Sequence, residues 1–178
     1  MIFAIAALLL VVVAIMTLTT SGLVSQRESE FQIIANNLAR ESIEVIRSIR
    51  DSNSLAGAPW DTQLEPTEAA ITILDPSASM NPWQLTTGDP QLYITNGYYT
   101  HLAGNGIVSA FRRQVALDSI CSGTVGQPNA GEETLVAAPA GCPLGTTRVG
   151  LRVRASVTWN ERGRDRSINL EDYLYAWR

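Results

Sequence analysis

Hydrophobic residues fill the beginning of the chain without interruption. The first sixteen positions read MIFAIAALLLVVVAIM, and the run continues uncharged through Thr20. A helix of about 20 apolar residues spans the roughly 30 Å hydrocarbon core of a bilayer and satisfies its own backbone there. A cleavable signal peptide would need a basic stretch before this run and a small-residue cleavage site after it, and residues 21–26 show no such site. We therefore predict a retained membrane anchor over residues 1–20 and keep a signal peptide as the alternative.

From Arg27 onward the sequence becomes polar, but its apolar residues recur at helical spacing. Because Gly22 is the first glycine and Pro59 the first proline, we expect one helix from the start to about Asp51, roughly 75 Å long at 1.5 Å per residue. Gly57 and Pro59 then favour its end. The apolar stripe of the second half, which must pack on something, consists of Phe31, Ile34, Leu38, Val45 and Ile49.

Residues 55–90 are rich in Pro, Ser, Thr, Asp and Gly, which favours an irregular connection. Its one short apolar run, at 69–74, is a candidate strand. We expect Trp60 and Trp83 to hold this connection in place.

The remainder, residues 91–178, carries the alternation typical of antiparallel strands. Asn96-Gly97, between two short β-rich runs, predicts a tight hairpin. A strand is expected over 110–117, with Phe111, Val115 and Leu117 inward. The clearest strand is 149–159, followed by a charged turn at 160–164 and a returning strand over 167–171. The chain closes with an aromatic cluster, placed on the sheet edge or against the helix: Tyr173, Leu174, Tyr175 and Trp177.

A sheet with one apolar face must bury that face, and the helical stripe at 31–49 is the available cover. We therefore predict an α+β fold, in which the second half of a long N-terminal helix packs on a small antiparallel sheet. The parts are a helix over 1–54, a connection over 55–90 and a sheet head over 91–178. The sheet residues expected to meet the helical stripe are Val153, Val157 and Trp159.

Cys121 and Cys142 bound a segment rich in Gly, Pro, Ser and Ala. Two cysteines on the outer side of a membrane commonly pair, so we favour a disulfide over two free thiols. Together with His101, the only histidine, they do not supply the four clustered ligands that zinc requires. We expect no metal and no cofactor.

The residues that carry most enzyme chemistry are scarce. His101 lies beside the predicted hairpin among tyrosines, and no serine stands in a nucleophile setting such as G-x-S-x-G. The adjacent acidic pairs at 132–133 and 171–172 point apart on strands and are better explained as solvated faces. We therefore expect a protein that is not an enzyme, with His101 in a surface or packing role.

Charge is distributed unevenly along the chain, which has a pI near 5.0. Residues 1–89 carry four arginines and ten acidic residues, whereas residues 90–178 carry nine arginines and seven acidic residues. If Arg112, Arg152 and Arg154 share the outer sheet face, they can bind an anion or DNA. We favour instead a solvated face that pairs with acidic residues of another copy, which would be Glu28, Glu30, Glu41 and Glu44.

Two segments resemble a known family. Residues 35–53 (ANNLARESIEVIRSIRDSN) resemble the second half of the helix in a bacterial minor-pilin-like group, and residues 157–164 (VTWNERGR) resemble that group's penultimate strand and turn. The whole arrangement resembles the type IV pilin and pseudopilin family, over about residues 1–54 and 149–178. This resemblance implies a structural subunit of a type IV pilus-like filament, with helices inside and sheets outside.

One departure from the family pattern concerns the start of the chain. Family members have a short basic leader that is cleaved before a Phe-Thr-Leu-Ile-Glu-like start, whereas here Ile5 is apolar and no acidic residue precedes Glu28. We expect that the sequence begins just after that glutamate, because residues 4–7 look like those that normally follow it. The residues predicted to enter the membrane or the filament core are Met1, Ile2, Phe3, Ile5, Leu8, Leu9, Val12, Ile15 and Met16.

The expected partners are therefore identical copies in a helical filament, the membrane before assembly, and the assembly machinery, with the assembled protein outside the cell. Two alternatives stay open. The chain can be a pseudopilin or minor pilin of a secretion or DNA-uptake machine, which abundance in sheared surface fractions would separate from a major subunit. It can also be a single-pass protein with an outward binding domain, which would stay in membranes after shearing.

Overall fold

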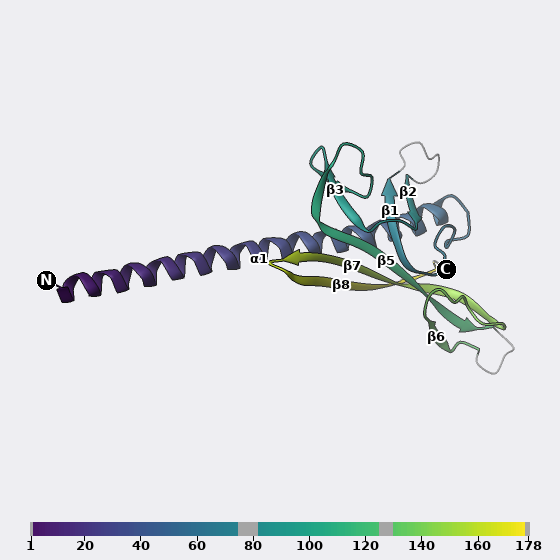
Figure 1. Cartoon of the computed structure of the whole chain (residues 1–178). Helices are drawn as coiled ribbons and strands as arrows, with labels where there is room; N and C mark the ends of the chain where they lie inside the picture. The colour runs from purple at the N-terminus through teal and green to yellow at the C-terminus, as the bar shows by residue number, and fades with distance from the viewer. Residues whose placement is uncertain (1, 75–81, 125–129, 177–178) are drawn as a thin grey trace. The chain divides into compact units, whose positions relative to one another are not determined.

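The computed structural model describes residues 2–74, 82–124 and 130–176. The chain divides into two compact units, residues 1–34 and residues 35–178. One helix, α1 (Ile2–Leu55), begins in the first unit and ends in the second (Figure 1). The helix ends at Leu55, close to the end that the sequence predicts. Beyond it, Gly57 takes a positive φ of 71°. The side-chain amide of Asn53 holds the following segment, because it donates to the carbonyls of Trp60 and Thr62 at 3.2 and 2.7 Å.

The second unit combines the end of α1 with an open antiparallel sheet, so the predicted α+β class is confirmed. Within the described residues the sheet has eight strands, of which β5, β7 and β8 are the longest. In chain order these are β1 (Thr67–Leu74), β2 (Trp83–Thr86), β3 (Gln91–Thr95), β4 (Tyr98–Thr100), β5 (Ile107–Gly123), β6 (Glu133–Val136), β7 (Thr146–Glu161) and β8 (Arg164–Tyr175).

Strand β5 organises the sheet. Along one edge it pairs with β7, from Phe111 opposite Trp159 to Gly123 opposite Thr146, and β8 continues the sheet beyond β7. Its other edge is shared by three strands in succession: β3 pairs with residues 107–112, β1 with residues 115–117 and β6 with residues 119–122. Figure 1 shows the β1–β2 and β3–β4 hairpins as two separate arms beside β5.

Both predicted tight turns are present. Asn96 and Gly97 between β3 and β4 have φ values of 52° and 84°, the pair of positive angles that a two-residue hairpin of this kind requires. Arg162 and Gly163 between β7 and β8 have φ values of 53° and 77°. The side chain of Asn160 supports the second turn, because it accepts from the Gly163 amide at 3.1 Å and donates to Asp165 at 2.8 Å.

The core lies between α1 and one face of the sheet. Every second residue of β7 is buried from Leu151 to Trp159, as the alternation predicts. The helical residues from Ala35 onward bury the complementary stripe. Among the buried apolar side chains of this core are Leu38, Ile46, Ile49, Leu92, Phe111, Val115, Leu117, Leu151, Val153, Val157 and Trp159.

The prediction of an irregular connection over residues 55–90 is wrong in part. Thr67–Leu74 forms β1, with Ala70, Ile71 and Thr72 buried, and Trp83–Thr86 forms β2, paired with β1. β1 confirms the candidate strand over residues 69–74, whereas β2 was not expected, because it is only four residues long and is flanked by turn-forming residues. The sheet head therefore begins near Thr67 and not at residue 91.

The segment between the two cysteines also contains a strand that the composition did not indicate. Its residues Glu133–Val136 form β6 and pair with Ser119–Ser122 of β5. Of the predicted terminal aromatic cluster, Leu174 is buried on β8, whereas Tyr173 and Tyr175 are about half exposed. Trp177 lies outside the described residues.

Candidate functional site

The apolar side chains that the structure describes over residues 2–5 and 8–23 are exposed. In α1 an 18-residue window has a mean hydropathy of 2.9, and none of that window is buried by the rest of the chain. By length and composition this helix is able to cross a membrane. Consecutive leucines at 8, 9 and 10 are 64%, 58% and 73% exposed, so the apolar surface extends around the helix and is not confined to one face.

Most residues predicted for the membrane or filament core lie on this exposed surface. Val12 is the least exposed of them, at 41%, and Phe3 the most exposed, at 91%. Met1 lies outside the described residues. The others that the structure describes as exposed are Ile2, Ile5, Leu8, Leu9, Ile15 and Met16.

The hydroxyl groups that follow the apolar run are satisfied within the helix. Thr17 donates to the carbonyl of Val13 at 2.6 Å, and Thr19 donates to that of Ile15 at 2.8 Å. Thr20 and Ser21 make equivalent bonds one turn back. Because these groups need no water or partner, the surface up to residue 21 is compatible with a lipid or protein environment.

The residues predicted to pack the helix on the sheet divide between the two units. Leu38, Val45 and Ile49 are buried in the second unit, as are Val153, Val157 and Trp159 from β7. Phe31 and Ile34 belong to the first unit and are each half-buried.

The predicted arginine face differs from the expectation in one respect. The register places Arg152 opposite Asp118 and Arg154 opposite Ala116, so both arginines share a sheet face with the Asp118 carboxylate. Asp118 accepts from Arg152 at 2.7 and 2.9 Å and from Arg154 at 3.0 and 3.2 Å. The positive charges of Arg152 and Arg154 are therefore partly neutralised by Asp118.

Asp118 is fully buried, and burial opposes ionisation of its carboxyl group. The backbone amide of Ala138, at 2.9 Å, and the two guanidinium groups outweigh that effect and hold the pKa of Asp118 below its ordinary value. Arg112 lies on the same face but away from this cluster, 3.5 Å from the exposed Asp89. An anion would have to displace Asp118 to use Arg152 and Arg154 together.

Sequence analysis missed a buried arginine that faces the helix. Arg113 alternates with Phe111 and Val115 on β5 and is only 2% exposed. Its guanidinium group forms an ion pair with Glu41 of α1 at 3.0 Å and donates to Thr72 of β1 at 3.4 Å. The sequence signal that could have identified it is the alternation over 110–117, in which Arg113 occupies an inward position. Glu41, expected to pair with another copy, pairs within its own chain.

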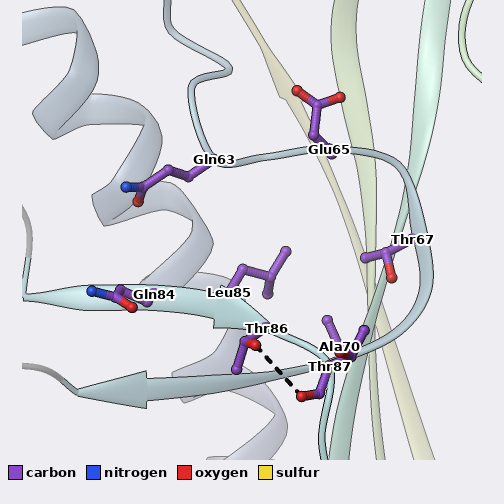
Figure 2. A pocket seen from close by; sticks show the side chains of 8 residues that line it. All are labelled: Gln63, Glu65, Thr67, Ala70, Gln84, Leu85, Thr86 and Thr87. Carbon is purple, nitrogen blue, oxygen red and sulfur yellow. Dashed lines mark hydrogen bonds between the residues drawn. The ribbon is translucent and has the colours of Figure 1, made fainter.

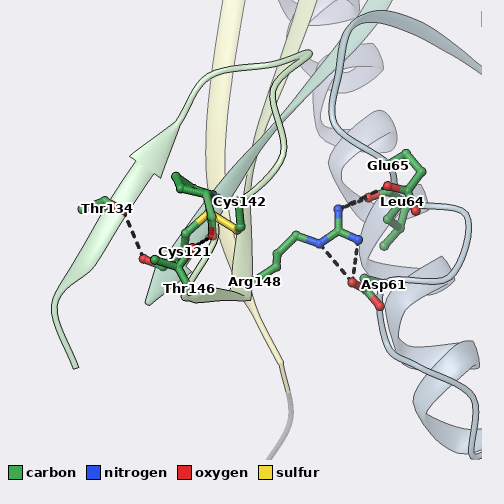
Figure 3. Close-up of a disulfide and its surroundings, with 9 residues drawn as sticks. Asp61, Leu64, Glu65, Cys121, Thr134, Cys142, Thr146 and Arg148 are labelled. Carbon is green, nitrogen blue, oxygen red and sulfur yellow. Dashed lines mark hydrogen bonds and ion pairs between the residues drawn. A yellow bond between two sulfur atoms is a disulfide. The ribbon is translucent and has the colours of Figure 1, made fainter. Parts of the chain in front are cut away.

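Two further arginines join distant segments of the second unit. Arg47 of α1 contacts Asp172 of β8 and Glu44 of its own helix, each at 2.6 Å, so Glu44 also pairs within its chain. Arg148 of β7 reaches the segment after α1, where it donates to the Asp61 carboxylate at 2.9 Å and to the Leu64 carbonyl at 3.1 Å (Figure 3).

Arg148 also explains the expected role of one tryptophan. Its guanidinium carbon lies 5.9 Å from the centre of the Trp60 ring, a cation–π arrangement. Trp60 therefore helps to fix the segment after α1, as predicted. Trp83 belongs to β2 instead.

The cysteines favoured as a pair do form a disulfide, with their Cα atoms 5.6 Å apart (Figure 3). The bond joins buried Cys121 of β5 to Cys142, and it encloses β6. Among the described residues, no group of three or more His, Cys, Asp or Glu side chains is placed to hold a metal ion.

His101 has a packing position at the end of the β3–β4 hairpin, where it is 9% exposed. Burial and the neighbouring charge of Arg113 lower its pKa to about 4. The ring is therefore neutral at physiological pH.

A hollow of about 480 Å³ opens beside β1 and β2 (Figure 2). Its lining offers hydroxyl and amide groups and one carboxylate, that of Glu65, which lies 3.7 Å from Arg148. These lining residues do not include a nucleophile next to a base. The residues that line it are Gln63, Glu65, Thr67, Ala70, Gln84, Leu85, Thr86 and Thr87.

Comparisons with protein-family models, with curated proteins and with solved structures found no match. The features that remain for a functional argument are those of the chain itself: an uncovered apolar helix segment, a sheet head closed on that helix's second half, and a disulfide.

Proposed function

We propose that the chain is a structural subunit of a type IV pilus-like extracellular filament, assembled through the apolar segment of α1. One observation carries the proposal: the apolar side chains described over residues 2–5 and 8–23 stay uncovered all around the helix. Such a surface is unfavourable in water at roughly 25 cal/mol for each Å² of apolar area. It requires either lipid or the same segment of other copies.

Both environments suit the segment at different stages. Before assembly it is long and apolar enough to reside in a bilayer. In a filament, its small residues Ala4 and Ala14 allow neighbouring helices to approach closely. Contacts between unlike surfaces of identical subunits do not close into a ring and produce a helical fibre.

The second unit supports an exterior position for the head. Disulfides persist in oxidising compartments outside the cytoplasm, and Cys121 and Cys142 are paired. An apolar helix that continues into an amphipathic half packed on an antiparallel sheet is compatible with the pilin-like fold that residues 35–53 and 157–164 resemble.

The test uses the full chain in the cells that produce it. Surface material is sheared from the cells, imaged by cryo-electron microscopy and analysed by mass spectrometry. We expect fibres built from this chain, and we expect Val12→Arg to abolish them because it places a charge in the apolar contact. Ser25→Arg, an exposed position in the polar part of α1, is the matched control and should assemble.

Retention of the chain in the membrane fraction after shearing, without fibres, would contradict the proposal and favour the single-pass anchored protein. Fibres in which this chain is a trace component would favour the minor-pilin alternative.

A further inference from the structure

A second cleft of about 480 Å³ lies where the two hairpin arms leave β5. The pairing of β3 along β5 reaches Arg112, and the pairing of β1 begins at Val115. Arg113 therefore stands at the fork between the arms, which Figure 1 shows as separate ribbons. The cleft follows from the sharing of one strand edge by two hairpins.

The floor of the cleft contains an incompletely used hydrogen-bond donor. Of the Arg113 guanidinium group, one terminal nitrogen contacts Glu41 at 3.0 Å and the other contacts Thr72 at 3.4 Å. Its Nε is buried and has no hydrogen-bond partner. A buried donor without a partner is costly, so a ligand oxygen that reached this Nε by displacing the atoms that cover it would be favoured.

The charges of the floor are balanced before any ligand arrives. Arg113 and Glu41 form an ion pair, and the other lining residues that the structure describes carry no charge. The Glu41 side chain is 42% exposed, so its carboxylate remains accessible as an acceptor. A small anion or cation would gain little from this pair, whereas neutral hydroxyl groups can both accept from it and donate to it.

The rim of the cleft is aromatic. Trp83 of β2 lies on one arm, and Tyr98 and Tyr99 of β4 lie on the other. The Tyr99 ring is held edge-on against buried Phe111, with ring centres 6.0 Å apart and planes at 81°. Tyr98 is 76% exposed, so its ring is available for contact.

We propose that this cleft binds a neutral saccharide. Sugar rings combine an apolar face, which packs against aromatic side chains, with hydroxyl groups that suit a balanced pair of donor and acceptor. Aromatic surface with a few placed polar groups is the usual composition of a small-ligand site. The inference concerns the second unit alone and does not depend on filament assembly.

The test uses the full chain in a zwitterionic detergent without a sugar head group. Saturation-transfer NMR is recorded with glucose, galactose, mannose, N-acetylglucosamine and their disaccharides. We expect at least one of them to bind. Tyr98→Ala should weaken that binding by about threefold to tenfold, and Tyr173→Ala, a half-exposed tyrosine on β8 outside the cleft, should leave it unchanged.

Acetate and tetramethylammonium serve as charged probes and should not displace the sugar. The proposal is overturned if none of the sugars binds, if both tyrosine variants weaken binding equally, or if acetate displaces the bound sugar. Tyr98 is largely exposed, so a lost signal in Tyr98→Ala with an unchanged far-UV circular dichroism spectrum reports on binding and not on folding.

Discussion

The two halves of α1 have the same backbone but opposite relations to their surroundings. In the first unit the apolar side chains point outward around the helix, and at residues 8–10 they are more than half exposed. In the second unit Ala35, Ile46 and Ile49 are completely buried. The difference shows that helix formation alone does not decide how a helix is used: the second half folds the head, and the first half stays uncovered by the rest of the chain.

The strongest way to break this comparison is to place the same charge in each half. Ile46→Arg buries a cation without a partner in the core, so we expect a loss of about 4 kcal/mol or more in the free energy of unfolding of the head. Chemical denaturation in detergent, followed by tryptophan fluorescence, measures it. A head of unchanged stability would mean that the helix does not contribute to the core as described.

Val12→Arg is the counterpart in the first half. It should reduce membrane partitioning by roughly 2.5 to 3.5 kcal/mol, the cost of an arginine at the centre of a membrane helix. Unfolding of the head should be unchanged. Alkaline carbonate extraction of membranes measures the partitioning, and equal extraction of wild type and variant would argue against a membrane role for this segment.

Removal of the disulfide measures how much of the stability of the head comes from the closed segment between Cys121 and Cys142 and not from packing on α1. Cys121→Ser with Cys142→Ser should lower the free energy of unfolding by about 3 kcal/mol, because a closed segment of 21 residues is released in the unfolded state. Denaturation of wild type with and without a reducing agent gives the same comparison. Membrane extraction is the internal control and should not change.

The stability of the head should depend on pH, whereas the first half of α1 has no ionisable side chain before Arg27 and should not respond to pH. The pKa of His101 is about 4 in the folded protein, below its ordinary value of 6.5. The unfolded chain therefore binds a proton more readily, and stability falls as the pH drops from about 6.5 toward 4. Between pH 7 and pH 5 the loss should be about 2 kcal/mol.

Other groups also titrate in that range, so the measurement is a difference between two proteins. His101→Gln should lose less stability than wild type over the same pH interval, as seen in denaturation midpoints. Identical pH profiles would show that His101 is not buried in its neutral form.

The smallest expected effect concerns the outer sheet face. Asp118→Ala leaves Arg152 and Arg154 without their shared carboxylate and the Ala138 amide without its acceptor. Both arginines are partly exposed and can be rehydrated, so we expect a loss of about 1 to 2 kcal/mol. Asp118→Asn should recover part of it through the Ala138 contact, and a more stable Asp118→Ala protein would contradict this account.

Local signals were sufficient for the elements that carry them. The apolar run and the 27–51 periodicity predicted the helix, Asn96-Gly97 and the charged residues 160–164 predicted the two turns, and strict alternation predicted β7. The apolar run at 69–74 indicated β1. Strands β2 and β6 are only four residues long and lie among turn-forming residues, so they depend on their pairing with β1 and β5.

The same reason explains the missed side chains. The role of Asp118 can be recognised only from the strand register, which places it opposite Arg152. The role of Arg113 can be recognised only from the packing of α1, which brings Glu41 within 3.0 Å of it. The disulfide was predictable because the sequence has only two cysteines, so only one intramolecular pairing is possible. The cleft at Arg113 is a product of how the two hairpin arms diverge, which the residue pattern does not encode locally.

The division of one β5 edge among three strands makes the head modular. Strands β1, β3 and β6 each pair with their own short stretch of β5, whereas β7 pairs with the opposite edge of β5 along most of its length. An arm can thus be lengthened, shortened or exchanged without moving its neighbours out of register. A change in one of these strands is separated in this way from the pairing of β5 with β7.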